Sequence, residues 1–344
     1  MKSKDLSILV AGAGAIGGIT AAILRKNGFD VELICRNEKQ ASGISSEGLN
    51  VRGVCGTFSV RIPAYTSVTQ VKGKKDLILH ATKAPEMAES AKALLPVLKE
   101  GGYIVSMQNG ICEDELASVA GAGKVIGCVT GWGATMLSAL ELEMTSGGDF
   151  ILGYPGREPD EFLAAVAETL SVIVPAQTTG NIMGHLYSKL IINSCISSLG
   201  AICGLYLGKM LGIRKIRNIF IEIIREAVEV SDRMGIRIEV FGGRLDFRKF
   251  ISGNGFVANL KRHLMIRFIG FKYRRLKSSS LQSLERGRKT EVDYFNGYIV
   301  RNAQQYGVNV PVNARIVDII HEIELKRRGI SVDNFSDPVF SRFS

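Results

Sequence analysis

Short apolar runs and helical patterns alternate through the first half of the chain. The runs have the length of buried strands, and the clearest are Ile8 to Ala11, Asp76 to Lys83 and Gly102 to Gly110. Apolar residues at helical spacing follow them at Ile19 to Leu24, Ala84 to Leu98 and Asp160 to Val174. This alternation predicts an α/β fold in which helices cover a mostly parallel sheet.

Other segments carry different patterns. Period-two alternation predicts a hairpin from Leu49 to Ile62, and further strands are expected at Val125 to Thr135, Glu141 to Thr145 and Phe150 to Gly153. From about residue 181 to near Arg328 the pattern is helical. We therefore expect an α/β domain over residues 1–180 and an all-α domain over residues 181–344. The length of 344 residues can bury two such cores.

One apolar run is long enough to raise the question of a membrane span. Leu190 to Gly208 has 19 residues and no charge. The run also contains an asparagine, serines and glycines. We therefore expect a buried helix that breaks near Gly200 or Gly204, and no membrane span.

A glycine-rich turn follows the first strand directly. The pattern GxGxxG stands between a strand and a helix and consists of Gly12, Ala13, Gly14, Ala15, Ile16 and Gly17. In this setting the pattern is typical of dinucleotide binding. The first glycine permits the turn, the second lets a pyrophosphate approach the backbone, and the third lets the helix pack on the sheet. The N–H groups that begin the helix would hold the phosphates.

The end of the second strand indicates which dinucleotide to expect. An NAD site has an acid there, about 20 residues beyond the glycines, which binds the ribose 2′-hydroxyl. This chain has Cys35 at that position, followed by Arg36, and Glu32 lies too early, inside the strand. A guanidinium suits a 2′-phosphate, so we predict NADPH as the cofactor. An ordinary surface arginine is the alternative that the residues leave open.

Positive charge is concentrated in one segment. The net charge is +10, and Arg244 to Lys289 contains thirteen Lys and Arg residues against Asp246 and Glu285. Such a block can bind nucleic acid or an anionic membrane. No nucleic-acid motif accompanies it. We expect a solvated helical face, with neither nucleic acid nor a membrane as partner.

Cysteine usage indicates the compartment. The six cysteines show no CxxC pair and no histidine at metal-ligand spacing, as in a reduced protein without a metal site. The stretch from Met1 to Leu6 runs straight into the first strand and leaves no room for a signal peptide. We expect a cytoplasmic protein.

A polar stripe crosses the apolar run of the second half. Lys189, Asn193 and Ser197 are spaced i, i+4, i+8, so a helix would carry them on one face. Apolar surroundings can lower the pKa of a lysine into the range of a general acid. A lysine that reaches solvent beside an internally satisfied asparagine is the alternative. Further along, Glu291 and Asp293 are expected in a basic helix, where Glu291 could bind a hydroxyl or orient the lysine.

Taken together, these motifs resemble those of the ketopantoate reductases (2-dehydropantoate 2-reductases) over nearly the whole chain. The most specific match is the run from Thr290 to Gly297, with Gly307 to Pro311 after it. The resemblance implies a Rossmann-type NADP-binding domain followed by an all-α domain. It implies cofactor contacts from the glycine turn, Arg36, Lys83, Asn109, Ala134 and Glu291. It implies substrate contacts from Asn109, Lys189, Asn193, Ser197 and Ser280.

The resemblance also implies a reaction, the NADPH-dependent reduction of ketopantoate to pantoate in pantothenate biosynthesis, at a cleft between the domains. Lys189 would polarise the carbonyl group and donate a proton, and Glu291 would hold a substrate hydroxyl and position Lys189. Two positions depart from the family pattern. Ser197-Ser198 stand where Asn-Pro is common, and Leu207 stands near an expected asparagine. The identity of the 2-oxo acid is therefore left open.

Two other functions are compatible with parts of the sequence. A 3-hydroxy acid dehydrogenase would share the Lys-x-x-x-Asn spacing, but the run from Thr290 to Tyr294 argues against it. An NADP-binding sensor without turnover is disfavoured by Lys189 and Glu291. We expect a small-molecule 2-oxo acid as partner. The oligomeric state stays open, with a homodimer as one candidate.

Overall fold

An eight-stranded sheet forms the centre of the first half of the chain. Its strands lie in the order β12-β11-β8-β7-β6-β1-β2-β5. They are β1 (Ile8–Ala11), β2 (Val31–Ile34), β5 (Ala64–Tyr65), β6 (Lys75–His80), β7 (Leu98–Ser106), β8 (Val125–Thr130), β11 (Phe150–Gly153) and β12 (Ala176–Thr178). Neighbours from β5 to β8 pair in parallel, and β11 pairs antiparallel with β8. The mostly parallel sheet confirms the predicted fold class.

The order of strands reverses at β1. The chain first places β2 and β5 on one side of β1 and then places β6, β7 and β8 on the other. All four residues of β1 are buried, which explains its continuous apolar run. In an open parallel sheet, ligands bind beyond the carboxyl ends of the strands at such a reversal.

A second, four-stranded sheet was not predicted. Its order is β4-β3-β10-β9, with β3 (Leu49–Gly53), β4 (Phe58–Val60), β9 (Gly133–Ser138) and β10 (Glu141–Ser146). The β3–β4 pair is the predicted hairpin. The single strand expected from Val125 to Thr135 is wrong, because β8 and β9 belong to different sheets. The chain leaves β8 at Gly131, where a Cβ atom would lie 2.4 Å from Asp149 Oδ1.

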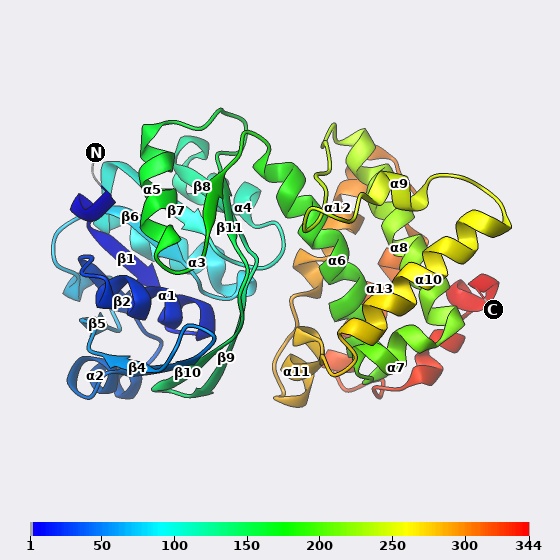
Figure 1. Cartoon of the computed structure of the whole chain (residues 1–344), viewed down its shortest axis with the longest axis horizontal. Helices are drawn as coiled ribbons and strands as arrows, with labels where there is room; N and C mark the ends of the chain where they lie inside the picture. The colour runs from blue at the N-terminus through cyan, green and yellow to red at the C-terminus, as the bar shows by residue number, and fades with distance from the viewer. Residues whose placement is uncertain (1–2, 344) are drawn as a thin grey trace. The chain divides into compact units, whose positions relative to one another are not determined.

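The chain divides into two compact units, Met1–Ile182 and Met183–Ser344, and the computed structural model describes residues 3–343. Figure 1 colours the first unit blue to green and the second green to red. Helices of the first unit are α1 (Ala15–Lys26), α2 (Glu38–Ser46), α3 (Met87–Leu94), α4 (Glu113–Ala120) and α5 (Glu161–Ser171). The short α2 starts at a polar cap, since the Asn37 side chain accepts a hydrogen bond from the Gln40 N–H.

The second unit is helical. Its helices are α6 (Ile182–Cys203), α7 (Leu207–Gly212), α8 (Arg214–Arg233), α9 (Phe247–Ile251), α10 (Phe256–Lys272), α11 (Ser279–Glu285), α12 (Asn296–Tyr306) and α13 (Pro311–Glu324). Within this unit α10 packs on α7 and α8, and α12 packs on α13 and α8.

Helix α6 accounts for the long uncharged run. By length and composition it could cross a membrane, but 78% of its most apolar window is buried inside the protein, as in a core helix. It continues through Gly200, where a Cβ atom would lie 2.6 Å from the Ser278 hydroxyl oxygen. The helix ends before Gly204, whose φ of 71° is left-handed. Of the two expected break points, Gly204 is the one used.

Candidate active site

The glycine turn of the first unit has the geometry that a dinucleotide requires. Gly12 has φ of 107°, and a Cβ atom there would lie 2.8 Å from the carbonyl oxygen of Ala81. A Cβ atom at Gly17 would lie 2.1 Å from the Gly12 carbonyl oxygen, so only glycine lets α1 pack this closely. At Gly14 a Cβ atom would meet nothing within 4 Å, which leaves open space at the start of α1.

The start of α1 is also electrostatically suited to phosphate. No side chain caps the helix at Gly14, so its first N–H groups are left for a ligand. Ala15 and Ile16 are half-buried, whereas Ala13 is buried and its carbonyl oxygen accepts a hydrogen bond from Gln40 Nε2 at 3.1 Å. These residues therefore fit a pyrophosphate on the helix N-terminus.

Arg36 lies next to this turn and is exposed. It follows β2 by two residues, and the last residue of β2, Ile34, accepts a hydrogen bond from the Gly12 N–H at 3.0 Å. The Arg36 side chain is 84% exposed and lies 3.5 Å from the Glu86 carboxylate. An exposed pair of this kind contributes little stability, so an anionic ligand can compete for the guanidinium.

Glu32 and Cys35, near the end of β2, are not placed to bind a ribose hydroxyl. Glu32 is buried and forms an ion pair with Lys75, which is also buried. Its carboxylate also accepts a hydrogen bond from the Lys72 N–H. Cys35 is buried, and burial raises the pKa of its thiol to about 12. Arg36 is thus the exposed group at this position.

Lys83 and Asn109 follow two neighbouring strands. β6 ends at His80, so Lys83 is not in the strand as expected but is an exposed residue directly before the 3₁₀ turn Ala84–Glu86. Asn109 lies half-buried in the turn after β7 and has no hydrogen-bond partner among residues 3–343. Both turns follow the carboxyl ends of strands that pair in parallel. Ala134 is half-buried in β9, opposite Met144 of β10.

A buried polar network lies in the segments around these two strand ends. His80 is fully buried, and its Nδ1 lies 2.7 Å from Gln108 Nε2 while its Nε2 lies 3.0 Å from the Ser90 hydroxyl. Burial lowers the pKa of His80 to about 4, so the ring is neutral. The Ser106 hydroxyl donates to Gln108 Oε1 at 3.0 Å. The network fixes Gln108, the residue before Asn109.

In the second unit, α6 carries the polar stripe. The helix is continuous, so Lys189, Asn193 and Ser197 share one face, with Lys189 and Asn193 half-buried and Ser197 buried. The Asn193 amide makes no hydrogen bond with the residues that the structure describes. Its polar atoms are thus left for a ligand.

The serine that meets this stripe is Ser279 rather than Ser280. Ser278 caps α11, since its hydroxyl oxygen accepts from the Leu281 N–H at 3.2 Å. This cap leaves Ser280 buried at 3% exposure, whereas the exposed Ser279 has its hydroxyl oxygen 3.3 Å from that of Ser197. Ser279 was missed from the sequence because three serines stand in a row. The cap at Ser278 is the signal that distinguishes them.

Glu291 lies between two residues that hydrogen bonds anchor to α13. The expected helix over Glu291 and Asp293 is instead a 3₁₀ turn, Val292–Tyr294, with Glu291 half-buried at its start. Both the N–H and the hydroxyl of Thr290 donate to Glu324 Oε1, each at 2.7 Å. Asp293 is exposed and bonds to His321 Nε2 at 3.0 Å.

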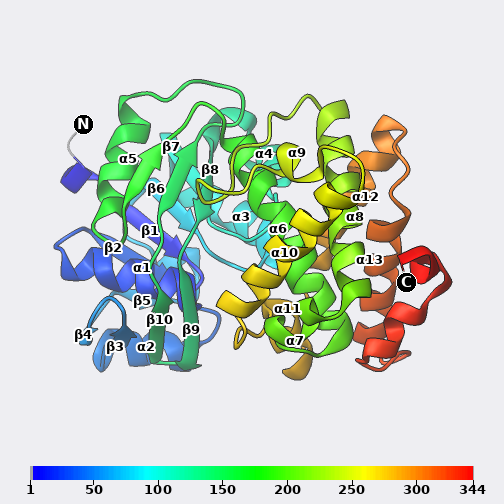
Figure 2. The ribbon, with the colours of Figure 1, turned by 45° about the vertical axis from the view of Figure 1, so that its right-hand side comes forward.

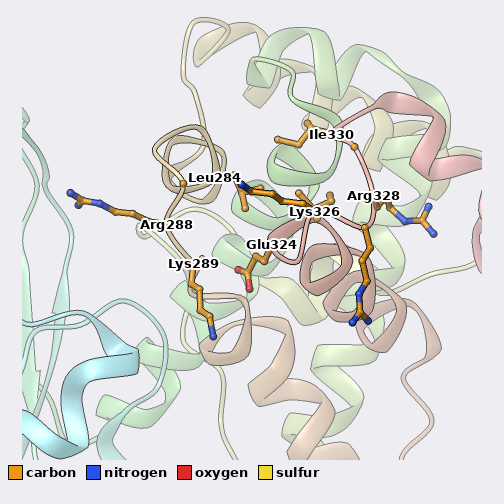
Figure 3. Close-up of a pocket in the computed structure, with 11 residues that line it drawn as sticks. Leu284, Arg288, Lys289, Glu324, Lys326, Arg328 and Ile330 are labelled. Atoms are coloured by element: carbon orange, nitrogen blue, oxygen red, sulfur yellow. The ribbon is translucent and has the colours of Figure 1, made fainter.

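The carboxylate that holds Thr290 lies in a basic pocket of about 590 Å³. Figure 3 shows Glu324 inside this pocket, with the side chains of Arg288 and Arg328 extending to either side. Arg328 donates to Glu322, and its guanidinium also bonds to Asn334. Through its hydrogen bonds with Thr290, Glu324 links the end of α13 to the residue before Glu291.

Known families and structures match the chain in both units. The family model described as ketopantoate reductase PanE/ApbA matches residues 8–157, and its C-terminal model matches residues 181–324. The 2-dehydropantoate 2-reductase of Pyrococcus abyssi is 30% identical over 92% of this chain and 97% of its own. The chain belongs to the ketopantoate reductase family. It is an oxidoreductase, as its relatives are.

Solved structures of other proteins have the same fold. The crystal structure of a PanE/ApbA family ketopantoate reductase from Ralstonia eutropha matches with a TM-score of 0.80 at 26% identity, and covers 94% of this chain and 99% of the other. A D-mandelate dehydrogenase solved with NADH and anilino(oxo)acetate matches with a TM-score of 0.78 at 22% identity, over 93% and 98% of the two chains. The likeness to D-mandelate dehydrogenase concerns the fold alone.

The family motif around Asn296 has a structural explanation in this chain. Ser198, fully buried, donates its hydroxyl hydrogen to Asn296 Oδ1. Asn296 Nδ2 donates to Asn313 Oδ1 at 2.9 Å, and Asn313 Nδ2 donates to Glu226 at 2.7 Å. This network ties α6, α12, α13 and α8 together. No cluster of three or more His, Cys, Asp or Glu side chains suited to a metal occurs within residues 3–343.

Proposed function

We propose that this chain is an NADPH-dependent reductase of a 2-oxo acid, with ketopantoate as substrate and pantoate as product, and so serves pantothenate biosynthesis in the cytoplasm. The observation that carries the proposal is the stripe of Lys189 and Asn193 on α6, because no structural partner uses the asparagine. A half-buried lysine beside an amide that no other described residue engages suits a small carbonyl substrate better than it suits a helix core.

NADPH is the cofactor that best fits the first unit. The glycine turn would hold the pyrophosphate, and Arg36 would hold the 2′-phosphate in place of its weak contact with Glu86. Glu32 cannot serve an NAD ribose without breaking its buried pair with Lys75. When bound, the reduced nicotinamide supplies the hydride that the protein itself cannot provide. We place Lys83, Asn109, Ala134 and Glu291 among the further cofactor contacts.

The residues of the second unit would handle the proton and the substrate. Lys189, as an ammonium ion, would polarise the substrate carbonyl and donate a proton to its oxygen. Glu291 would hold a substrate hydroxyl and orient Lys189. Asn193 and Ser197 would bind the carboxylate end, and Asn109 is a further candidate for a substrate contact. We assign the serine contact to Ser279, because Ser280 is buried.

The test is the oxidation of NADPH in the presence of 2-oxo acids, with ketopantoate among them, followed by absorbance. We expect turnover with ketopantoate that Lys189→Ala lowers by about 10²–10⁴. Lys209→Ala, an exposed lysine of the same unit, is the control and should keep full activity. NADPH binding without turnover on any 2-oxo acid would favour the sensor and refute the proposal.

A second candidate is a reductase of a different 2-oxo acid. Ser197 favours it, because a serine at this place in the stripe is shorter than the asparagine common in the family and leaves room for another substrate group. The same panel of acids decides between the two. A higher kcat/KM for another 2-oxo acid than for ketopantoate would establish this candidate.

A further inference from the structure

One pocket of the second unit is lined by cations from two separate segments. It is the basic pocket around Glu324, and its volume of about 590 Å³ lies in the range of small-molecule sites. The segment after α11 and the end of α13 form its walls. Figure 2 shows α13 beside α8, and Figure 3 shows the pocket. Its charged residues are Arg288, Lys289, Glu324, Lys326, Arg327 and Arg328.

Most of these cations have no acidic partner. Arg328 bonds to Glu322 and Asn334, but the other four form no ion pair with any residue from 3 to 343. Like charges gathered around one cavity repel one another, and a bound anion of several charges replaces this repulsion by attraction. The pocket therefore carries positive charge that the described part of the chain does not neutralise.

The one carboxylate of the pocket is already in use. Glu324 Oε1 accepts hydrogen bonds from the N–H and the hydroxyl of Thr290, each at 2.7 Å. In Figure 3 the Glu324 side chain lies between those of Lys289 and Lys326, yet it forms an ion pair with neither lysine. Five cations against this one acid leave a surplus of four positive charges around the cavity.

Lys326 stands at a position that favours glycine. Its φ is 58°, and no other residue except glycine has a positive φ within residues 3–343. The Lys326 N–H donates to the Ile323 carbonyl oxygen at 2.9 Å, and the Arg327 N–H donates to that of Glu322 at 2.8 Å. This pair of bonds ends α13 in a Schellman motif, whose left-handed residue is usually glycine. A lysine there costs backbone strain that glycine would avoid, and such outliers gather at ligand sites.

The dipole of α13 explains only part of the charge. Cations are favourable near the C-terminus of a helix, and Lys326, Arg327 and Arg328 follow the last turn of α13. Arg288 and Lys289 come instead from the segment between α11 and Thr290. Two parts of the chain thus bring cations to one cavity, which capping of α13 does not require.

We propose that this pocket binds a small ligand that carries at least two phosphate groups. Lysines bind phosphate as point charges, and guanidinium groups bind its oxygens in pairs. Four unpaired cations match the charge of a diphosphate, whereas a single carboxylate would leave most of them uncompensated. The cavity has the size of a small-molecule site, so a nucleic-acid chain is not the occupant that it fits. No residue of the proposed catalytic set lines it, so this inference stands apart from the proposed function.

The test is isothermal titration calorimetry of the full chain with inorganic pyrophosphate at about 0.15 M NaCl, with and without saturating NADPH. We expect a Kd of about 10–100 μM that NADPH does not raise. Lys326→Gly removes one charge and supplies the residue that the Schellman motif favours, so it should raise this Kd by at least about 10-fold. Lys289→Gln should have the same effect. Lys209→Gln removes an equal charge at an exposed position of α7 and should leave the Kd unchanged.

The glycine turn of the first unit also suits a pyrophosphate, so NADPH and Arg36→Ala separate the two sites. A Kd above about 1 mM would overturn the proposal. So would binding that NADPH or Arg36→Ala abolishes while Lys326→Gly and Lys289→Gln leave it unchanged, because the ligand would then lie on the glycine turn. An equal Kd for sulfate would indicate a general anion patch and would overturn the assignment to two phosphates. Circular dichroism spectra that match wild type establish that the variants fold.

Discussion

Replacing Glu113 by glutamine should change how the stability of the first unit depends on pH. Glu113 is 1% exposed at the start of α4. Burial raises its pKa from 4.5 to about 7, although the hydrogen bond from the Cys112 N–H acts in the opposite direction. Because the folded pKa is the higher one, the folded state binds more protons than the unfolded state between these values. The stability that proton binding at Glu113 gives to the folded state is therefore complete below pH 4.5, and it is lost as pH rises through about 7. The pKa difference corresponds to about 3 kcal/mol.

In Glu113→Gln the loss of stability with rising pH disappears, because an amide does not titrate. The amide can still accept the hydrogen bond from the Cys112 N–H. The assay is urea unfolding followed by the fluorescence of Trp132, the single tryptophan, which is 5% exposed in the first unit. The variant should gain about 3 kcal/mol over wild type between about pH 4.5 and pH 8. Glu115→Gln, an exposed acid on the same helix, should follow wild type. Parallel pH curves for Glu113→Gln and wild type would refute the reasoning.

Other substitutions test the remaining sites. Arg36→Ala should raise the KM for NADPH by roughly 10- to 100-fold, since a hydrogen bond to a charged group contributes about 1.5–3 kcal/mol. It should leave the KM for NADH unchanged, and equal effects on both KM values would contradict the assignment. Combining Lys189→Ala with Glu291→Gln should reduce kcat by less than the product of the two single effects, because both residues serve one transition state. Glu32→Gln should lower the free energy of unfolding by about 3–5 kcal/mol, since it leaves Lys75 buried without its partner; urea midpoints, with the exposed Glu38→Gln as control, measure this.

Features set by local chemistry were predictable from the sequence. The glycine turn follows from the need for a positive φ at Gly12 and for close packing at Gly17, and both needs act within one turn of chain. The stripe on α6 follows from helical spacing alone. The family resemblance of these motifs is confirmed by the family models and relatives.

Features set by distant contacts were not predictable. The continuous apolar run from Val125 to Thr135 gives no sign that the chain changes sheets, because the change depends on Asp149 lying against Gly131. The sequence around His80 gives no sign of its partners, because Gln108 and Ser90, which bond to its two ring nitrogens, come from other segments of the chain.

The two serines that depart from the family pattern have different consequences. Ser198 stands where proline is common, but it is fully buried and its hydroxyl donates to Asn296 Oδ1. A proline there would remove this donor, which Asn296 Oδ1 uses while Asn296 Nδ2 donates to Asn313 and Asn313 Nδ2 donates to Glu226. Ser197 instead lies on the face of Lys189 and Asn193, with its hydroxyl near Ser279. A change of substrate within this family would therefore act through Ser197, while Ser198 belongs to the scaffold that holds the stripe in place.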